Sequence, residues 1–305
     1  RVTGEIKKFA PNAKIVHIDI ESAAISRNVT VDIPIVADAK AAILKILEHT
    51  EPMEHKEWLD EIQGWDKEYP LQMEVKDGVN PQRIIETLNE VYADRDTVFT
   101  SDVGQHQMWA SQYLKLDATH RLVQSGGLGT MGFGLPSAVG AQIGCPEKSI
   151  VSISGDGGFQ MNMQELQTVV YHNLNMKIVI LNNDGYHSIR QTQTNLFEPP
   201  MVGVNSENGI SFPSMEKLAY AYGIPYIKVD ANAENWDELM KELEKDGPLL
   251  LEAVVDEKQN FAPKLSSKAL PDGTMVSPEL DDMYPFLTKE EYEAAKGKLR
   301  SDHVI

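Results

Sequence analysis

Six short apolar runs alternate with amphipathic stretches between residues 80 and 256. Short apolar runs bounded by turn signals are typical of buried strands, and apolar residues at helical spacing are typical of helices that cover a sheet. The expected strands lie at 97–101, 121–124, 149–154, 177–181, 226–229 and 249–255. This alternation predicts an α/β fold with a mainly parallel sheet flanked by helices.

The pattern is weaker before residue 80. Residues 13–19 predict a strand, and residues 39–47 predict an apolar-faced helix that Asp38 caps. These two elements are too few to close a sheet. We therefore expect residues 1–50 to be the end of a truncated, Rossmann-like central α/β domain. The start at Arg1 favours a piece of a longer polypeptide.

The remaining boundaries follow from shifts in composition. Residues 51–79 are charged and predict a linker with a helix, and residues 80–256 predict the main domain. Residues 257–305 predict a C-terminal lid or tail, whose last helix starts with a capping box formed by Thr288 and Glu291. This tail is expected to be either a lid that closes over the site or a static contact between subunits.

Charge and cysteine content narrow the class of function. The formal net charge of −18 disfavours binding to nucleic acid or anionic membranes. The single cysteine, Cys145, excludes an internal disulfide framework and fits a reducing compartment. No apolar run approaches the roughly 18 residues that a membrane span needs, and no signal peptide is visible. These features predict a cytoplasmic protein.

Two neighbouring strands end in polar residues. Asp156 follows strand 149–154, and Asn183 comes 27 residues later, after strand 177–181. One helix is expected between the strands, with its apolar face formed by Met163, Leu166, Val170 and Leu174. A right-handed crossover makes the strands parallel, so both side chains are expected at the ligand-binding edge of the sheet.

This pair of oxygens suits Mg²⁺, which prefers about six oxygen ligands, including phosphate oxygens. The backbone carbonyl of Gly185 is a candidate third protein ligand. Gly157 and Gly158 leave room for backbone amides to approach a phosphate. The alternative is an ordinary tight turn, which Gly-Asp-Gly triplets also form.

A glycine-rich loop precedes this site. Residues 127–132 satisfy the spacing G-x-G-x-x-G and follow an expected strand, which favours a dinucleotide site at first sight. Such a site requires an acidic residue about 20 positions later to hold a ribose, and the next strand instead ends at Asp156. We interpret the glycines as a place where backbone approaches a flat ring, with Met131 beneath it.

Taken together, the stretches 103–109, 125–136 and 155–158 and the Asn182-Asn183 pair resemble the acetolactate synthase branch of the thiamine diphosphate enzymes. Residues 2–4 and 17–20 resemble the central domain of that family. The similarity covers residues 1 to about 195.

The resemblance implies a thiamine diphosphate-binding fold and specific roles. Asp156, Asn183 and the Gly185 carbonyl hold Mg²⁺. The backbone of Gly129 and Met131 holds the pyrimidine, and Met131 supports the bent cofactor, which makes these two the catalytic residues. The residues around the diphosphate are Gly104, Gln105, His106, Gly155, Gly157 and Gly158. The alternatives are that Met131 belongs to the core and that His106 satisfies a local carbonyl at a helix start.

The implied reaction is decarboxylation of a 2-oxo acid such as pyruvate, followed by carboligation to a second 2-oxo acid, as in branched-chain amino acid biosynthesis. The family also needs a glutamate from a pyrimidine-binding domain of the same or a neighbouring subunit. A homodimer or homotetramer is therefore expected, and residues 1–305 alone are expected to be inactive. FAD occurs in some members but cannot be judged, because most of the central domain is absent.

The segment 184–193 departs from the Gly-Met-Val and Gln-Trp-Glu-like sequence of acetolactate synthases. His187 and Arg190 are candidates for binding a substrate carboxylate, and Arg190 alternatively pairs with an acidic surface residue. The departure leaves two other functions open. One is another thiamine diphosphate-dependent 2-oxo acid decarboxylase, oxidase or carboligase; the other is a non-catalytic cofactor-binding partner subunit.

Overall fold

The chain forms two units in the computed structural model, which describes residues 3–71, 75, 77–197, 199–233, 235–270 and 272–302. One unit comprises residues 72–261, and the other joins residues 1–71 to residues 262–305. Val2, residues 72–74 and 76 of the expected linker, and residues 271 and 303–305 of the expected tail lie outside the described residues. The domain boundaries expected at residues 50, 79 and 256 stay predictions.

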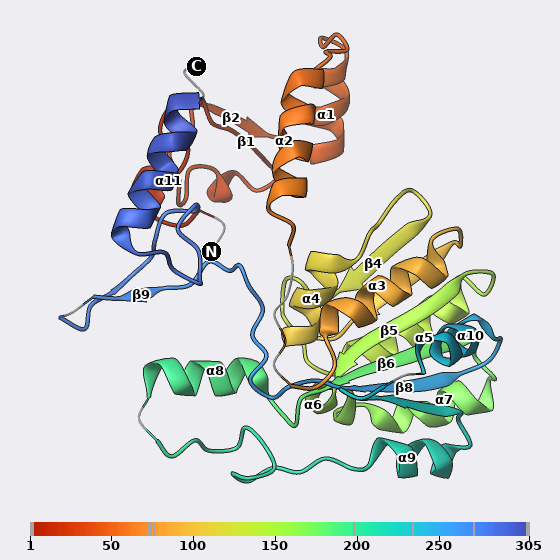
Figure 1. Ribbon diagram of the computed structural model, residues 1–305. Coiled ribbons are helices and arrows are strands. Elements are labelled where there is room, and N and C mark those ends of the chain that lie inside the picture. The colour runs from red at the N-terminus through yellow and green to blue at the C-terminus, as the bar shows by residue number, and fades with distance from the viewer. Residues whose placement is uncertain are drawn as a thin grey trace. The chain divides into compact units, whose positions relative to one another are not determined.

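The larger unit is built on a six-stranded sheet in the order β4-β3-β5-β6-β8-β7 (Figure 1). Every neighbouring pair of these strands is parallel. The strands are β3 (Thr97–Ser101), β4 (His120–Gln124), β5 (Ser149–Gly155), β6 (Met176–Asn182), β7 (Tyr226–Val229) and β8 (Leu249–Val254). All six expected strands are present, with ends that differ by at most one residue. The prediction of a mainly parallel α/β sheet is confirmed.

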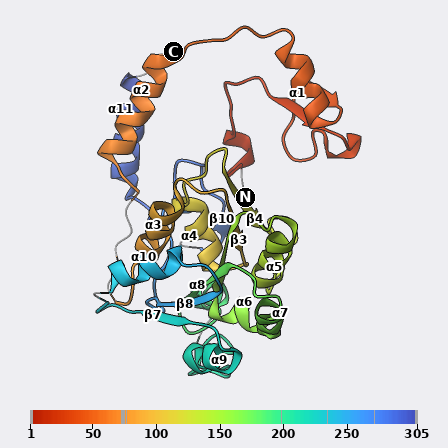
Figure 2. The same cartoon turned by 90° about the vertical axis from the view of Figure 1, so that its right-hand side faces the viewer.

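Helices cover both faces of this sheet (Figure 2). One face carries α3 (Pro81–Tyr92), α4 (Gln105–Tyr113) and α10 (Trp236–Glu244). The other carries α5 (Gly134–Gly144), α6 (Asp156–Gln160), α7 (Leu166–Tyr171) and α9 (Met215–Tyr222). The helix α8 (His187–Leu196) begins five residues after β6 ends.

Alternating strand positions supply the two hydrophobic cores. Val151 and Ile153 of β5 pack with α3 and α4, whereas Ile150 packs with α5 and α7. Because successive side chains of a strand point to opposite faces, a strand that is buried on both sides must be apolar at nearly every position. This explains why the continuous apolar runs in the sequence located the strands accurately.

The prediction of a single helix between β5 and β6 is wrong. The chain forms three short pieces there, α6, the 3-10 turn η3 (Met163–Glu165) and α7. Asn162 breaks the helix and donates its side-chain amide to the carbonyl of Gly132 at 2.7 Å. The break shifts the buried face, so Val169 is fully buried whereas Val170 is 36% exposed.

The other unit contains two small sheets. Its strands β1 (Val16–Asp19) and β2 (Ile33–Val36) are parallel, and β9 (Lys268–Ala269) and β10 (Met275–Val276) are antiparallel. Its helices are α1 (Ala39–Leu47), α2 (Lys56–Glu68) and α11 (Lys289–Asp302), with the 3-10 turns η1 (Ile6–Lys8) and η2 (Ser22–Ala24). The expected strand at 13–19 is present but starts at Val16.

Local capping predictions hold in this unit. Asp38 accepts the amide of Ala41 at 2.9 Å, which confirms the cap on α1. The hydroxyl of Thr288 accepts the amide of Glu291 at 3.3 Å, while the Glu291 carboxylate accepts the Thr288 amide at 2.9 Å, which confirms the capping box. The strand β2 was not predicted, because Pro34 within it argues against a strand.

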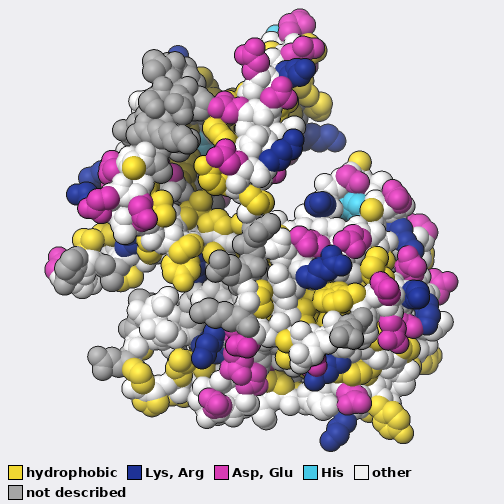
Figure 3. All heavy atoms as spheres, viewed as in Figure 1, with side chains coloured by type: hydrophobic (Ala, Val, Ile, Leu, Met, Phe, Trp, Pro, Cys, Tyr) yellow, Lys and Arg dark blue, Asp and Glu magenta, His cyan; other side chains and the backbone are white. Residues whose placement is uncertain are grey.

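On the face drawn in Figure 3, acidic side chains are interspersed with Lys and Arg over the unit that holds the six-stranded sheet. Within the described part of the chain, no helix is both long enough and apolar enough to cross a membrane.

Lys177 is buried at the amino-terminal end of β6, where Nζ donates to the carbonyls of Lys245 (2.5 Å) and Gly247 (2.7 Å). Burial lowers the pKa of Lys177 from 10.5 to about 8. Between these two pH values the unfolded chain binds more protons than the folded chain, so this group makes stability rise with pH. We expect urea unfolding of the protein to show that the free energy of unfolding rises between pH 8 and pH 10.5, and we expect Lys177→Met to make this rise smaller. An identical slope in the variant would contradict the assignment.

Candidate active site

Asp156 and Asn183 emerge at the same edge of the sheet. Asp156 directly follows β5 and Asn183 directly follows β6, and these neighbouring strands pair in parallel up to Gly155 and Leu181. Both side chains are buried, with exposures of 0% for Asp156 and 5% for Asn183. The topology therefore places both residues at the sheet edge that the sequence analysis expected, and their binding of a metal stays a prediction.

The carboxylate of Asp156 is incompletely satisfied. Its Oδ2 accepts the amide of Gly185 at 2.7 Å, while its buried Oδ1 has no hydrogen-bond partner among the described residues. Burial raises the pKa of Asp156 to about 7, although the backbone amides of Gly185 and Gly157 pull it down. A buried carboxylate oxygen without a partner is costly, and a bound cation removes that cost.

The donor set suits Mg²⁺ better than a metal held by protein alone. No group of three or more His, Cys, Asp or Glu gathers into a metal site within the described ranges. Mg²⁺ is commonly held by one or two protein carboxylates together with substrate phosphates and water. One buried carboxylate beside an amide side chain and a glycine turn fits that mode.

Each glycine next to Asp156 leaves room for a side chain from another segment of the larger unit. A Cβ atom at Gly155 would lie 2.9 Å from Nδ1 of His106, and one at Gly158 would lie 2.5 Å from Oδ1 of Asp102. At Gly157 it would overlap the ring of Tyr186. These positions require glycine for internal packing, whatever the loop binds.

Most predicted site residues line one pocket at this edge, and all of its lining residues belong to the larger unit. The predicted residues that line it are Gly104, Gln105, His106, Met131, Gly155, Gly157, Gly158, Asn183, Gly185 and His187. Asp156, Gly129 and Arg190 are not among the lining residues. Trp109, Tyr186, Ser188 and Ile189 complete much of the wall. The roles assigned to these residues stay predictions.

His106 and Met131 bear on two of the open alternatives. Burial lowers the pKa of His106 to about 4, opposed by the charge and a backbone hydrogen bond of Asp102. The ring is therefore neutral at pH 7, and its buried Nε2 has no partner among the described residues. The Nε2 atom is therefore available to a ligand, and the alternative of a local role at the helix start stays open. Met131 is partly exposed at the pocket.

Asp102 organises the glycine-rich loop, and sequence analysis missed it. Its Oδ1 accepts the amides of Val103 (2.7 Å) and Gly132 (3.0 Å), and its Oδ2 accepts the amide of Gly134 (2.8 Å). The side chain is fully buried. A carboxylate that follows β3 at the ligand-binding edge was the available signal. Its partners 30 and 32 residues away were not visible in the sequence.

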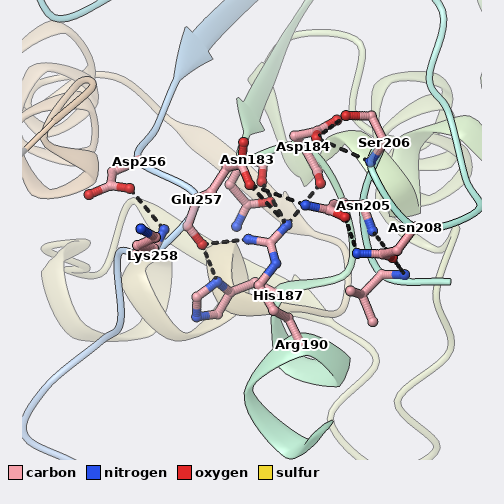
Figure 4. A network of polar contacts seen from close by, with 12 residues as sticks. Asn183, Asp184, His187, Arg190, Asn205, Ser206, Asn208, Asp256, Glu257 and Lys258 are labelled. Atoms are coloured by element: carbon pink, nitrogen blue, oxygen red, sulfur yellow. Dashed lines mark hydrogen bonds and ion pairs between the residues drawn. The ribbon is translucent and has the colours of Figure 1, made fainter. Parts of the chain in front are cut away.

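His187 and Arg190 lie on α8 with their polar atoms directed at the chain itself (Figure 4). His187 Nδ1 donates to the carbonyl of Glu257 at 2.9 Å, and its Nε2 lies 3.0 Å from Oδ1 of Asn260. Arg190 contacts backbone carbonyls and lies 3.8 Å from the Glu257 carboxylate, as the acidic-pair alternative expects. Binding of a substrate carboxylate by either residue stays a prediction.

Comparison with known proteins agrees with this geometry. Residues 102–253 match the family described as "Thiamine pyrophosphate enzyme, C-terminal TPP binding domain", and residues 1–46 match "Thiamine pyrophosphate enzyme, central domain". The family resemblance inferred from the motifs is thus confirmed.

Individual relatives point to one branch of that family. The chain is 38% identical over 274 residues to "Acetolactate synthase large subunit" of Porphyra purpurea, covering 87% of this chain and 45% of the relative. It is 36% identical over 273 residues to "Probable acetolactate synthase large subunit" of Methanococcus aeolicus (84% and 45%). It is 38% identical over 278 residues to "Acetolactate synthase 2, chloroplastic" of Nicotiana tabacum (88% and 42%). The chain spans less than half the length of these relatives.

Proposed function

Because the chain belongs to the thiamine pyrophosphate enzymes, we propose that it is the C-terminal part of an enzyme that decarboxylates pyruvate and joins the remaining fragment to a second 2-oxo acid. The cofactors are thiamine diphosphate and Mg²⁺. The observation that carries the proposal is the buried Oδ1 of Asp156, which has no partner among the described residues and lies at the same edge of the sheet as the buried Asn183.

The residues at this edge divide into three groups by task. Asp156, Asn183 and the carbonyl of Gly185 hold Mg²⁺, which neutralises the diphosphate. Gly129 and Met131 hold the pyrimidine. The residues that surround the diphosphate are Gly104, Gln105, His106, Gly155, Gly157 and Gly158. The bound cofactor supplies an electron sink for the decarboxylation, while the protein supplies orientation and electrostatics.

His106 and the pocket wall support this division. A neutral imidazole with a free, buried Nε2 accepts or donates one hydrogen bond without placing a second positive charge beside Mg²⁺. Trp109 and Ile189 make part of the wall apolar. Electrostatic interactions with a bound ligand are stronger next to an apolar wall than in water.

Catalysis also requires a glutamate from a pyrimidine-binding domain of the same or a neighbouring subunit. The proposal therefore includes assembly into a homodimer or homotetramer. Without that domain, residues 1–305 can hold the cofactor but lack the group that acts on the pyrimidine. We propose that they are inactive by themselves.

A second candidate keeps the cofactor and changes the reaction to that of another 2-oxo acid decarboxylase, oxidase or carboligase. The observation in its favour is the wall formed by Tyr186, Ser188 and Ile189, because these residues belong to the segment that departs from acetolactate synthases. A different wall changes which second substrate fits, whereas the cofactor contacts are unaffected.

The test uses the full-length protein, by which we mean residues 1–305 together with the proposed pyrimidine-binding domain. It is titrated calorimetrically with thiamine diphosphate, with and without Mg²⁺, and its products are then analysed with pyruvate as the sole substrate. We expect Mg²⁺-dependent binding and formation of acetolactate, and no turnover by residues 1–305. Acetaldehyde or acetate as the product would favour the second candidate. Binding without turnover would favour a non-catalytic partner subunit, and no Mg²⁺-dependent binding would overturn the cofactor assignment.

A further inference from the structure

Arg190 engages backbone oxygens on two sides of its guanidinium (Figure 4). On one side, Nη2 donates to the carbonyl of Asp184 at 2.9 Å and lies 3.4 Å from that of Asn183. On the other side, Nη1 donates to the carbonyl of Glu257 at 2.5 Å. The residue is 8% exposed. A planar guanidinium presents five N–H donors in a rigid fork, which suits acceptors that lie in different directions.

The first of these sides is the turn that carries Asn183 and Gly185, two of the three predicted metal ligands. Asp184 has a φ of 51°, which is unfavourable for a residue with a side chain, and Gly185 has a φ of 130°. The Asp184 carboxylate accepts the hydroxyl of Ser206 at 2.5 Å, and the amide of Gly185 donates to Asp156 at 2.7 Å. A strained turn persists only when surrounding contacts hold it. Arg190 contributes contacts of this kind.

The second side is the segment that follows β8, which we define as the post-β8 segment (residues 256–260). The carbonyl of Glu257 receives a hydrogen bond from Nδ1 of His187 as well as from Arg190. The side-chain oxygen of Asn260 receives one from Gln191 at 2.7 Å. Three residues of α8 thus hold the post-β8 segment through its backbone and one amide.

We propose that Arg190 is a positioning residue that couples the metal-binding turn to the post-β8 segment. Its guanidinium contacts both the turn and the post-β8 segment. A position of the guanidinium that favours its contacts with the turn therefore also favours its contacts with the segment. By linkage, Mg²⁺ bound at the turn stabilises the contacts to the segment by the same free energy by which those contacts strengthen Mg²⁺ binding. This inference rests on the proposed function for the identity of the ligand, but the contacts exist in the protein without it.

The same contacts argue against Arg190 as the group that reads a substrate carboxylate. Its guanidinium is buried against backbone carbonyls, and the residue is not part of the pocket lining. A substrate would have to displace two sets of internal hydrogen bonds to reach it. Lysine cannot replace it, because a compact ammonium on a flexible stem does not reach carbonyls on both sides in fixed geometry.

The test compares the full-length wild type with Arg190→Gln and Arg190→Lys. Arg121→Gln is the matched control, because Arg121 lies exposed on β4 and loses the same charge. Hydrogen exchange of peptides that cover residues 183–190 and 256–261 is measured first without ligand. We expect exchange in both peptides to speed up about tenfold in both Arg190 variants and not in the control.

The second measurement adds Mg²⁺ and thiamine diphosphate. We expect both cofactors to slow exchange of the 256–261 peptide in the wild type, and this protection to be lost in the variants. The half-saturating Mg²⁺ concentration should rise about tenfold, whereas KM for pyruvate stays the same. A raised KM with unchanged Mg²⁺ affinity and unchanged exchange would overturn the proposal in favour of a substrate contact.

The experiment distinguishes failure of the proposed function from failure of the role proposed for Arg190. If the wild type shows no Mg²⁺-dependent binding, the cofactor assignment fails, yet the ligand-free exchange data still decide whether Arg190 joins the two segments. If ligand-free exchange in the two peptides is the same in the wild type and in Arg190→Lys, the coupling is contradicted. The lysine variant keeps the charge, so this comparison remains available if the glutamine variant does not fold.

Discussion

Replacing Asp156 by asparagine in the full-length protein is expected to weaken Mg²⁺-dependent binding of thiamine diphosphate about 100-fold or more. The variant removes the buried carboxylate whose Oδ1 has no partner among the described residues, and a neutral amide cannot offset the charge of the cation. The neighbouring Gly185 amide retains an acceptor, because the asparagine Oδ1 can take the place of Oδ2. The substitution is therefore expected to weaken metal binding without disturbing the conformation of the loop.

Calorimetry with and without Mg²⁺ measures this effect directly. Asp96→Asn is the matched control, since Asp96 is an exposed residue just before β3, at the opposite edge of the sheet. Urea unfolding without ligand should show that Asp156→Asn is at least as stable as the wild type, because the substitution removes a buried charge that lacks a full set of partners. Binding that is unchanged in Asp156→Asn would sink the magnesium assignment.

Much of the larger unit was predictable because its strands are buried on both faces. Such strands are nearly continuous in apolar residues, and the parallel arrangement follows from their alternation with helices. The placement of Asp156 and Asn183 at one edge of the sheet required only that β5 and β6 be neighbours joined by a right-handed crossover. The structure confirms that neighbour relation. The part played by each residue in binding came from family resemblance, and spacing alone did not supply it.

What the sequence analysis missed depends on contacts between distant segments. Asp102 receives amides from a loop about 30 residues away, and the Arg190 guanidinium meets a carbonyl 67 residues away. Backbone acceptors of this kind carry no residue signature, so only the fold reveals them. The broken helix after β5 has the same origin. Asn162 reaches across to Gly132, and this tertiary contact accompanies a break that the helical periodicity did not predict.

Asp102 also explains why three separate loops keep their shape at the pocket. It follows β3, it accepts the amide of Gly132 in the glycine-rich loop and that of Gly134 at the start of α5, and its Oδ1 fills the space that a side chain at Gly158 would need. Gly132 has a φ of 82°, so that loop has little intrinsic preference for its conformation. The carboxylate therefore supplies order that the glycines do not.

We accordingly expect Asp102→Asn to lower the free energy of unfolding by about 2–4 kcal/mol. Asparagine offers one acceptor oxygen where the carboxylate offers two, and its amide group faces a backbone N–H that already needs an acceptor. The buried N–H group of Gly132 or Gly134 then loses its partner. Urea unfolding of the full-length protein measures the loss, and hydrogen exchange at 131–134 locates it.

Asp96→Asn serves again as the control, with an expected change within about 0.5 kcal/mol, because it is an exposed carboxylate that pairs loosely with Lys148 at 3.7 Å. Affinity for thiamine diphosphate should fall in Asp102→Asn even at saturating Mg²⁺, since the loop expected to hold the pyrimidine loses its support while Asp156 is untouched. This separates the two carboxylates: one variant loses the dependence on Mg²⁺, whereas the other keeps that dependence and loses affinity. Equal stability and affinity in Asp102→Asn and wild type would mean that the glycine-rich loop holds its shape without the buried carboxylate.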